Sequence, residues 1–205
     1  ELRSWSSGQT FNDKMNLEIK NNAYRESRGK ADWVIVCDAD ELLFHPALMA
    51  VLEAYRKQGI NYPRVRGYEM MPECIPRPGE DICEKYQSGA RFENLDKRAI
   101  FDPALDINFH IGCHSADFPS GAVESEYADI ALMHYKMLTR EYFLDRHKLL
   151  RERLSQFNID NKAGGHYLWD EKTKQNTYSS FLRQSRRIGF GPRPSSSIGP
   201  RAKAV

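Results

Sequence analysis

Residues 31–43 constrain the fold more than any other part of the chain. The run at residues 33–37 is short, apolar and rich in β-branched side chains, which is typical of a buried parallel strand. Three acids, Asp38, Asp40 and Glu41, follow within four residues. In open α/β sheets, ligands bind beyond the carboxyl ends of the strands. The stretch therefore predicts a central strand that carries carboxylates to a ligand site at the edge of a sheet.

The spacing of these acids indicates a cation site. Asp38 and Asp40 are two positions apart, so in an extended chain both side chains point to the same face. Two such carboxylates can share Mg²⁺ or Mn²⁺, whereas a strand that ends in solvated acids, the alternative, would leave them to repel each other. His114 and His134 each lie late in an expected strand and could add a ligand, which Mn²⁺ accepts more readily than Mg²⁺. For each histidine, a structural role at a strand end is the alternative.

Periodicity places the remaining elements. Helices are expected at residues 12–28 and 46–58, with Asn12 as an N-cap, Pro46 in a first turn, and Gly29 and Gly59 as stops; strands are expected at 33–37 and 62–71. Helices and strands that alternate in this way indicate a parallel sheet with right-handed crossovers. Residues 72–92, rich in proline and glycine, are expected to form a long irregular connection.

The second half predicts three more strands and one long helix. The strands are expected at residues 97–101, 107–114 and 127–137, and the helix follows the cap Thr139 and continues to about residue 157, after which the pattern fades. We expect one domain over residues 1–188 and a disordered tail over residues 189–205, which are rich in Gly, Pro and Ser.

Composition excludes several classes of protein. The net charge of +2 gives no electrostatic footprint for nucleic acid, and no apolar run approaches the ~18 residues of a membrane span. Four cysteines without a CxxC pair favour a reduced, cytoplasmic protein, with a Cys74–Cys83 bridge left open. The basic residues at 140–153 favour a solvated helix face, with peripheral contact to an anionic inner-membrane surface as the alternative.

Two other interpretations of the acidic motif lack their partners. The metal-binding strand of a P-loop NTPase requires a GxxxxGK[ST] loop upstream, and the sequence has none. In an aspartyl-phosphate phosphatase we would expect a Gly-Thr pair after the acids, and the chain has Glu41-Leu42 there. Neither interpretation is therefore favoured.

An ordered set of segments resembles a known enzyme family. Residues 31–42 resemble the DxD segment of bacterial GT-A glycosyltransferases of the family 2-like group, and three later segments, residues 96–103, 112–114 and 132–136, resemble that group's later motifs. The resemblance runs from about residue 11 to about residue 167. It implies an α/β, GT-A (Rossmann-like) fold with a mixed, mostly parallel sheet flanked by helices.

The resemblance also implies a reaction. A sugar would pass from a nucleotide-sugar donor to a hydroxyl of a saccharide or lipid-linked acceptor, with Mn²⁺ or Mg²⁺. Asp40 would bind the cation that bridges the donor diphosphate, Asp38 would assist through the cation or the donor ribose, and His114 or His134 would be a third metal ligand. Lys97 would add positive charge near the diphosphate; a solvated lysine is the alternative.

A general base is needed to take the proton of the acceptor hydroxyl. Glu69 and Asp96 are the candidates, with Asp117 as a third, and an ordinary surface acid is the alternative for each. Only about thirty residues precede the acidic motif, so we expect the domain to lack the N-terminal strands that bind the nucleotide base in this family. Two other functions stay open, a non-catalytic carbohydrate-binding or degenerate transferase module and a metal-dependent hydrolase.

Overall fold

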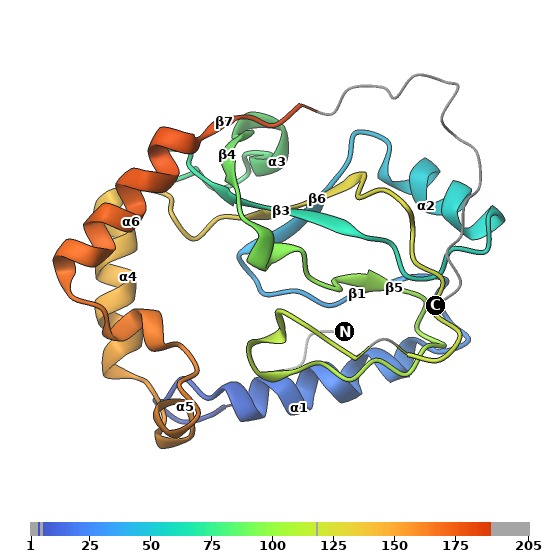
Figure 1. Cartoon of the computed structure of the whole chain (residues 1–205), viewed down its shortest axis with the longest axis horizontal. Helices are drawn as coiled ribbons and strands as arrows, with labels where there is room; N and C mark the ends of the chain where they lie inside the picture. Colours follow the sequence, from blue (N-terminus) through green and yellow to red (C-terminus); the bar gives the residue numbers. More distant parts are fainter. Residues whose placement is uncertain (1–3, 5, 118, 190–205) are drawn as a thin grey trace.

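Helices surround a mixed β-sheet in the computed structural model, which describes residues 4, 6–117 and 119–189 (Figure 1). The α-helices are α1 (Asp13–Ala23), α2 (Leu48–Lys57), α3 (Ile82–Lys85), α4 (Arg140–Glu152), α5 (Gln156–Asp160) and α6 (Glu171–Gln184). The 3-10 turns are η1 (Tyr24–Ser27), η2 (Glu93–Leu95), η3 (Ile111–Cys113) and η4 (Gly165–Leu168). The strands are β1 (Val34–Ile35), β2 (Glu41–Phe44), β3 (Val65–Met70), β4 (Ser88–Arg91), β5 (Ile100–Phe101), β6 (Ile130–His134) and β7 (Arg186–Arg187).

The main sheet has the strand order β2-β6-β3-β4-β7. Strands β3 and β6 are parallel, and the other three pairs are antiparallel. The expected α/β class with a mixed sheet flanked by helices is confirmed, but the prediction of a mostly parallel sheet is wrong. Three strands that the sequence pattern did not predict, β2, β4 and β7, each pair antiparallel with another strand of this sheet.

The strand expected at residues 33–37 is shorter and less central than predicted. Only Val34 and Ile35 form β1, which pairs with β5 in a separate two-stranded sheet. Ile35 is 48% exposed, so this strand is not buried on both faces. Instead of ending a central strand, Asp38 and Asp40 lie in the loop that joins β1 to β2, and Glu41 is the first residue of β2.

The predicted helix caps of α1 and α4 are confirmed. The side chain of Asn12 accepts from the backbone N–H groups of Lys14 and Met15, and the side chain of Thr139 accepts from that of Tyr142. Gly29 has a φ of +69°, as expected for a residue that ends a helical segment. The second helix, α2, begins two residues later than its expected start at residue 46.

Two predictions about irregular and extended chain are wrong. Residues 107–114 form a loop and η3, because their alternating apolar residues, Ile107 and Phe109, fill a core cluster around Tyr24 and do not belong to a strand. The segment 72–92, expected to be irregular, contains α3 and β4. Strand β4 includes Gly89, where an added Cβ would lie 2.8 Å from the backbone oxygen of Glu69, so the close approach of β4 to β3 requires glycine.

The helical pattern does not fade after residue 158. Helix α6 follows, because three apolar residues on one face, Tyr178, Phe181 and Leu182, pack in the core cluster of Phe143. Helices α4 and α6 lie side by side at one end of the sheet, and α2 lies at the other (Figure 1). The described part of the chain includes no helix that is long and apolar enough to cross a membrane.

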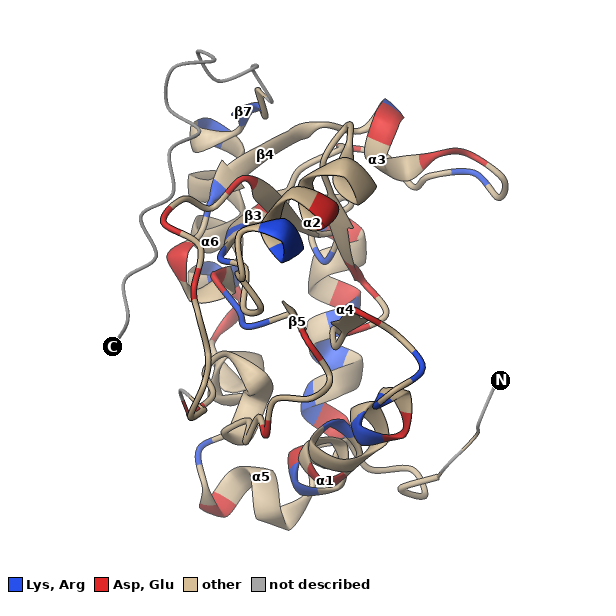
Figure 2. Cartoon of the chain, turned by 90° about the vertical axis from the view of Figure 1, so that its right-hand side faces the viewer, with Lys and Arg blue, Asp and Glu red and all other residues tan. Residues whose placement is uncertain are grey.

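Some expectations concern single residues or chain ends. Cys74 and Cys83 are both free, so the bridge left open by the sequence is not formed. Helix α4 carries acidic and basic residues along its length, although the sequence suggested a basic face (Figure 2). The expected disordered tail, apart from Gly189, lies outside the described residues.

Candidate functional site

The loop that carries Asp38 and Asp40, which we call the acidic loop, ends in a turn at the start of β2. The N–H of Glu41 donates to the backbone oxygen of Asp38 at 3.0 Å, and the N–H of Asp38 donates to Oε2 of Glu41 at 3.2 Å. A turn therefore replaces the extended backbone that the spacing of the acids predicted. As a result, Asp38 and Asp40 are engaged by different partners.

Asp38 faces two lysines. Nζ of Lys20, from α1, lies 2.6 Å from Oδ1 of Asp38, and Nζ of Lys97 lies 3.5 Å from Oδ2. Burial on its own would raise the pKa of Asp38, but the two ammonium groups outweigh it and hold the pKa below its usual value. Asp38 is therefore a carboxylate at neutral pH, fixed by cations of the chain itself.

Lys97 is buried, contrary to the alternative of a solvated lysine. Its side chain is 5% exposed and forms an ion pair with Glu41, whose side chain is 1% exposed. Burial lowers the pKa of Lys97, yet the charges of Glu41 and Asp38 raise it overall, so the amine stays protonated. Lys97 thus joins the loop acid Asp38 to the first residue of β2.

Asp40 faces the end of β6. Its Oδ2 lies 3.0 Å from Nη2 of Arg146, on α4, and 3.7 Å from Nε2 of His134. Burial on its own would raise the pKa of Asp40, but His134 and Arg146 outweigh this effect and hold the pKa well below its usual range. The backbone supports this placement, because the N–H of Tyr135 donates to the backbone oxygen of Asp40 at 2.8 Å.

His134 is held on its other side by Glu69. Nδ1 of the imidazole lies 2.7 Å from Oε1 of Glu69, and His134 is paired in the sheet with Glu41 on β2 and with Glu69 on β3. Burial lowers the pKa of His134, but Glu69 and Asp40 together raise it to about 9. The sheet register therefore places Glu41, His134 and Glu69 side by side on three neighbouring strands. Asp40 lies next to His134, the middle residue of the three.

The other predicted site residues lie elsewhere or have other partners. His114 is exposed and its Nδ1 lies 3.0 Å from the backbone oxygen of Asn94. Asp96 accepts from the N–H of Gly67 at 2.8 Å and pairs with Arg91, so it ties η2 to β3. Of the two histidines, the structure brings only His134 to Asp40. Asp117, the third candidate base, pairs with His110 in an exposed loop.

The predicted metal ligands are only partly brought together. Of Asp38, Asp40, His114 and His134, the pair Asp40 and His134 converges, and Asp38 is turned toward lysines. Within residues 4, 6–117 and 119–189, no group of three or more His, Cys, Asp or Glu side chains is arranged to hold a metal ion. A cation at this site would have two protein ligands and would depend on other groups for the rest of its coordination.

A second layer of polar side chains from the C-terminal half lies near the site, where the charges of Glu69 and Asp40 act on Lys136. Nζ of Lys136 lies 2.9 Å from Nε2 of His166 and 3.3 Å from the hydroxyl of Tyr167. Burial, then the charge of Lys136, lowers the pKa of His166 to about 3, so this ring is neutral and accepts from the lysine. Burial raises the pKa of Tyr167 to about 12. This layer adds a positive charge two residues beyond His134.

Sequence reasoning missed four residues that reach the site: Lys20, Lys136, Arg146 and His166. Only Lys136 had a local signal, because it lies two positions after His134 in one of the segments that carry the family resemblance. Lys20 and Arg146 belong to helices whose polar faces look solvated in the sequence. Their roles depend on tertiary placement that the pattern does not contain.

No protein-family model, no curated protein and no solved structure matches this chain. The function must therefore be inferred from the geometry of these residues.

Proposed function

We propose that this chain transfers a sugar from a nucleotide-sugar donor to an acceptor hydroxyl with the help of a divalent cation. One observation carries the proposal: Oδ2 of Asp40 and Nε2 of His134 face each other at 3.7 Å, while Glu69 holds the opposite nitrogen of the ring. A metal-binding histidine commonly donates its second N–H to a carboxylate in this way. The same proposal takes the mixed sheet as part of a GT-A-type domain in the cytoplasm.

The donor set fits Mn²⁺ better than Mg²⁺. It offers one carboxylate oxygen and, once His134 has released its Nε2 proton, one imidazole nitrogen, and Mg²⁺ accepts nitrogen ligands less readily. Cations of this class often have only one or two protein carboxylates and complete their shell with water and substrate phosphates. When bound, the cation would neutralise charge that grows on the departing diphosphate.

Cationic side chains of the protein would assist with the anionic donor. The side chain of Arg146 is 36% exposed, so its guanidinium can contact a phosphate while it remains near Asp40. Lys97 is too buried to do the same, and we assign it a positioning role between Asp38 and Glu41. The roles of Glu69 and Asp96 as bases stay predictions. Glu69 has one oxygen, Oε2, with no partner among the described residues.

Binding of UDP and GDP, measured by calorimetry with Mn²⁺ and with EDTA, tests the proposal. We expect binding of at least one nucleotide to require Mn²⁺ and to weaken by about tenfold or more in Asp40→Ala and His134→Ala. Asp160→Ala, which removes an exposed acid on α5, is the matched control and should bind like the wild type. Equal binding by Asp40→Ala and the wild type would refute the metal role.

A non-catalytic module is the second candidate, and one observation favours it. Lys20, Lys97 and Arg146 already neutralise Asp38 and Asp40, so the loop is electrostatically satisfied without a metal. Such a module would bind a saccharide and release no nucleotide. A transferase releases nucleoside diphosphate only when donor and acceptor are both present, whereas a hydrolase releases free sugar with no acceptor, so product analysis distinguishes the three.

A further inference from the structure

A cavity of about 390 Å³ lies at the opposite end of β1 from the acidic loop. Trp33, just before β1, lines it, whereas Asp38 and Asp40 follow that strand. Its walls come from three segments that are distant in the sequence: the turn after η1, the end of α2 and the residue after β5. We call this cavity the Trp33 pocket. Its volume lies near the lower end of the roughly 300–1,000 Å³ typical of small-molecule sites.

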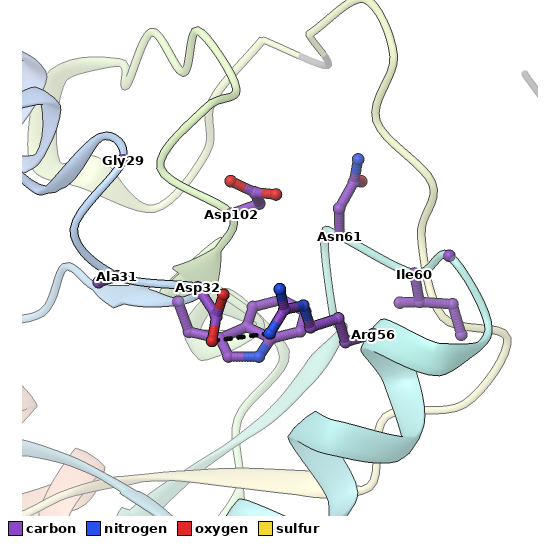
Figure 3. A pocket seen from close by; sticks show the side chains of 9 residues that line it. Gly29, Ala31, Asp32, Arg56, Ile60, Asn61 and Asp102 are labelled. Carbon is purple, nitrogen blue, oxygen red and sulfur yellow. Dashed lines mark ion pairs between the residues drawn. The ribbon is translucent and has the colours of Figure 1, made fainter.

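Four polar side chains are arranged around the open space of the pocket. Asp102 and Asn61 lie on one side, and the ion pair of Asp32 and Arg56, 2.8 Å apart, lies on the other (Figure 3). Gly29 and Gly59 add bare backbone to the wall, and a Cβ at either would meet nothing within 4 Å. Space for a ligand is therefore bounded by groups that can hydrogen-bond.

Hydrogen bonds hold Asn61 and Asp102 in place, and Asp102 can still accept a further hydrogen bond. The amide of Asn61 is held from both ends, by the oxygen of Gly121 at 3.0 Å and the N–H of Val123 at 2.7 Å. Oδ1 of Asp102 accepts from the N–H of Ala104 at 2.8 Å, and Oδ2 has no hydrogen-bond donor among the described residues. A carboxylate oxygen oriented in this way is a ready acceptor for a hydroxyl group.

Trp33 supplies the apolar part of the pocket. Its side chain is half-buried and packs partly on the core cluster of Leu52 and Ile100, which leaves the rest of its surface to line the cavity. An aromatic ring fixed by core packing is a rigid platform for an apolar ligand face. The pocket thus combines one aromatic platform with carboxylate and amide groups around it.

The charge of the pocket selects against anions. Two carboxylates, Asp32 and Asp102, face one guanidinium, that of Arg56, so the lining has a net negative charge. A phosphate or a carboxylic acid would be repelled. A pyranose ring matches the lining instead, because it has a C–H face that packs on an indole and hydroxyl groups that donate to carboxylates. We propose that the Trp33 pocket binds one pyranose unit of a neutral saccharide, at a site separate from Asp40 and His134.

Saturation-transfer NMR and calorimetric titration with the methyl glycosides of glucose, galactose, mannose and N-acetylglucosamine test the proposal. We expect at least one glycoside to bind the wild type at millimolar concentration. Ala31→Phe should abolish this binding, because Ala31 is exposed on the rim and a phenyl group there fills the cavity at little cost to the fold. Asp102→Asn, which keeps the size of the side chain and replaces Oδ2 with a donor, should weaken binding by about tenfold.

Two controls separate this site from the acidic loop. Asp160→Asn makes the same change as Asp102→Asn outside the pocket, and Asp40→Ala disrupts the proposed cation site; both should bind the glycoside like the wild type. Retention of binding by Ala31→Phe, or failure of all four glycosides to bind the wild type, would overturn the proposal. Tighter binding of glucose 1-phosphate than of methyl glucoside at the pocket would overturn the preference for a neutral ligand. None of these results depends on nucleotide binding.

Discussion

Glu69 and His134 are directly paired across two parallel strands, with Oε1 of the carboxylate 2.7 Å from Nδ1 of the imidazole. Glu69 is 3% exposed and its other oxygen has no partner among the described residues. A buried carboxylate with one neighbour exerts a strong local field. The pair therefore fixes both the orientation of the ring and the affinity of its nitrogens for protons.

Substitution Glu69→Gln should lower the pKa of His134. The imidazole has its pKa raised to about 9 by Glu69 and Asp40, against the lowering effect of burial. Glutamine keeps an acceptor for Nδ1 and removes the charge, so we expect a decrease of about one unit or more. The pKa can be followed by NMR of the imidazole C–H groups in EDTA. Glu93→Gln, an exposed acid in η2, is the control, and an unchanged pKa in Glu69→Gln would contradict the assigned cause.

The same pair predicts a dependence of stability on pH. The pKa of His134 is raised in the folded state, so its stabilising contribution is fully present below about pH 6.5 and is lost as the pH rises through about 9. We expect the free energy of unfolding of the wild type, measured with urea in EDTA, to exceed that of His134→Gln by a margin that shrinks across this window. The change should be at most about 3.5 kcal/mol. A constant margin from pH 6 to pH 9.5 would show that the histidine does not titrate as described.

Asp40 also makes the stability depend on pH, but at low pH and in the opposite direction to His134. Its pKa is lowered in the folded state, so its contribution is present at neutral pH and is lost as the pH falls below about 4. Stability of the site should therefore have a plateau between these limits. Asp40→Asn should reduce the decrease on the acid side, to which Asp38 still contributes, and should leave the alkaline decrease partly in place, because Glu69 still raises the pKa of His134.

Lys97 provides a test of burial without reference to catalysis. The side chains of Lys97 and Glu41 form an ion pair that is almost completely shielded from water. Lys97→Met should leave Glu41 as an unpaired buried charge and cost roughly 3–5 kcal/mol in the free energy of unfolding, measured with urea. Lys57→Met, which removes an exposed partner of Glu53, should cost less than about 0.5 kcal/mol. A double variant with Glu41→Gln should recover much of the loss, and equal effects of the two lysine substitutions would contradict the structure.

Local chemistry allowed part of this structure to be predicted. The caps Asn12 and Thr139 act within three residues, so the sequence contains all that determines them. The alternating pattern of β3 and the apolar run of β6 also indicate strands, and these strands carry Glu69 and His134. The caps and the type of each of these strands depend on residues that are close in sequence, whereas the pairing of β3 with β6 joins residues 65 positions apart.

The rest depends on contacts between distant residues. Arg146 pairs with Asp40 across 106 positions of the sequence, and the sequence pattern of α4 does not distinguish this arginine from a solvated one. Strand β2 consists of four residues, Glu41–Phe44, and so short an apolar run cannot be separated from a helix start by periodicity. Because no strand was predicted at Glu41–Phe44, its antiparallel pairing with β6 was not foreseen, and the sheet was wrongly predicted to be mostly parallel.

Gly89 shows how such a distant contact can be tested. Within the sequence it looks like a loop residue, yet it belongs to β4, and an added Cβ would lie 2.8 Å from both the backbone oxygen of Glu69 and Sδ of Met70. Gly89→Ala should therefore displace β4 or β3 and lower the free energy of unfolding by about 1–3 kcal/mol. Gly165→Ala, where a Cβ meets nothing within 4 Å, is the matched control and should have little effect. Because the displaced backbone is that of Glu69, the pKa of His134 should also change in Gly89→Ala and not in Gly165→Ala. A destabilised Gly89→Ala with an unaltered His134 titration would mean that the β3 backbone does not set the geometry of the pair.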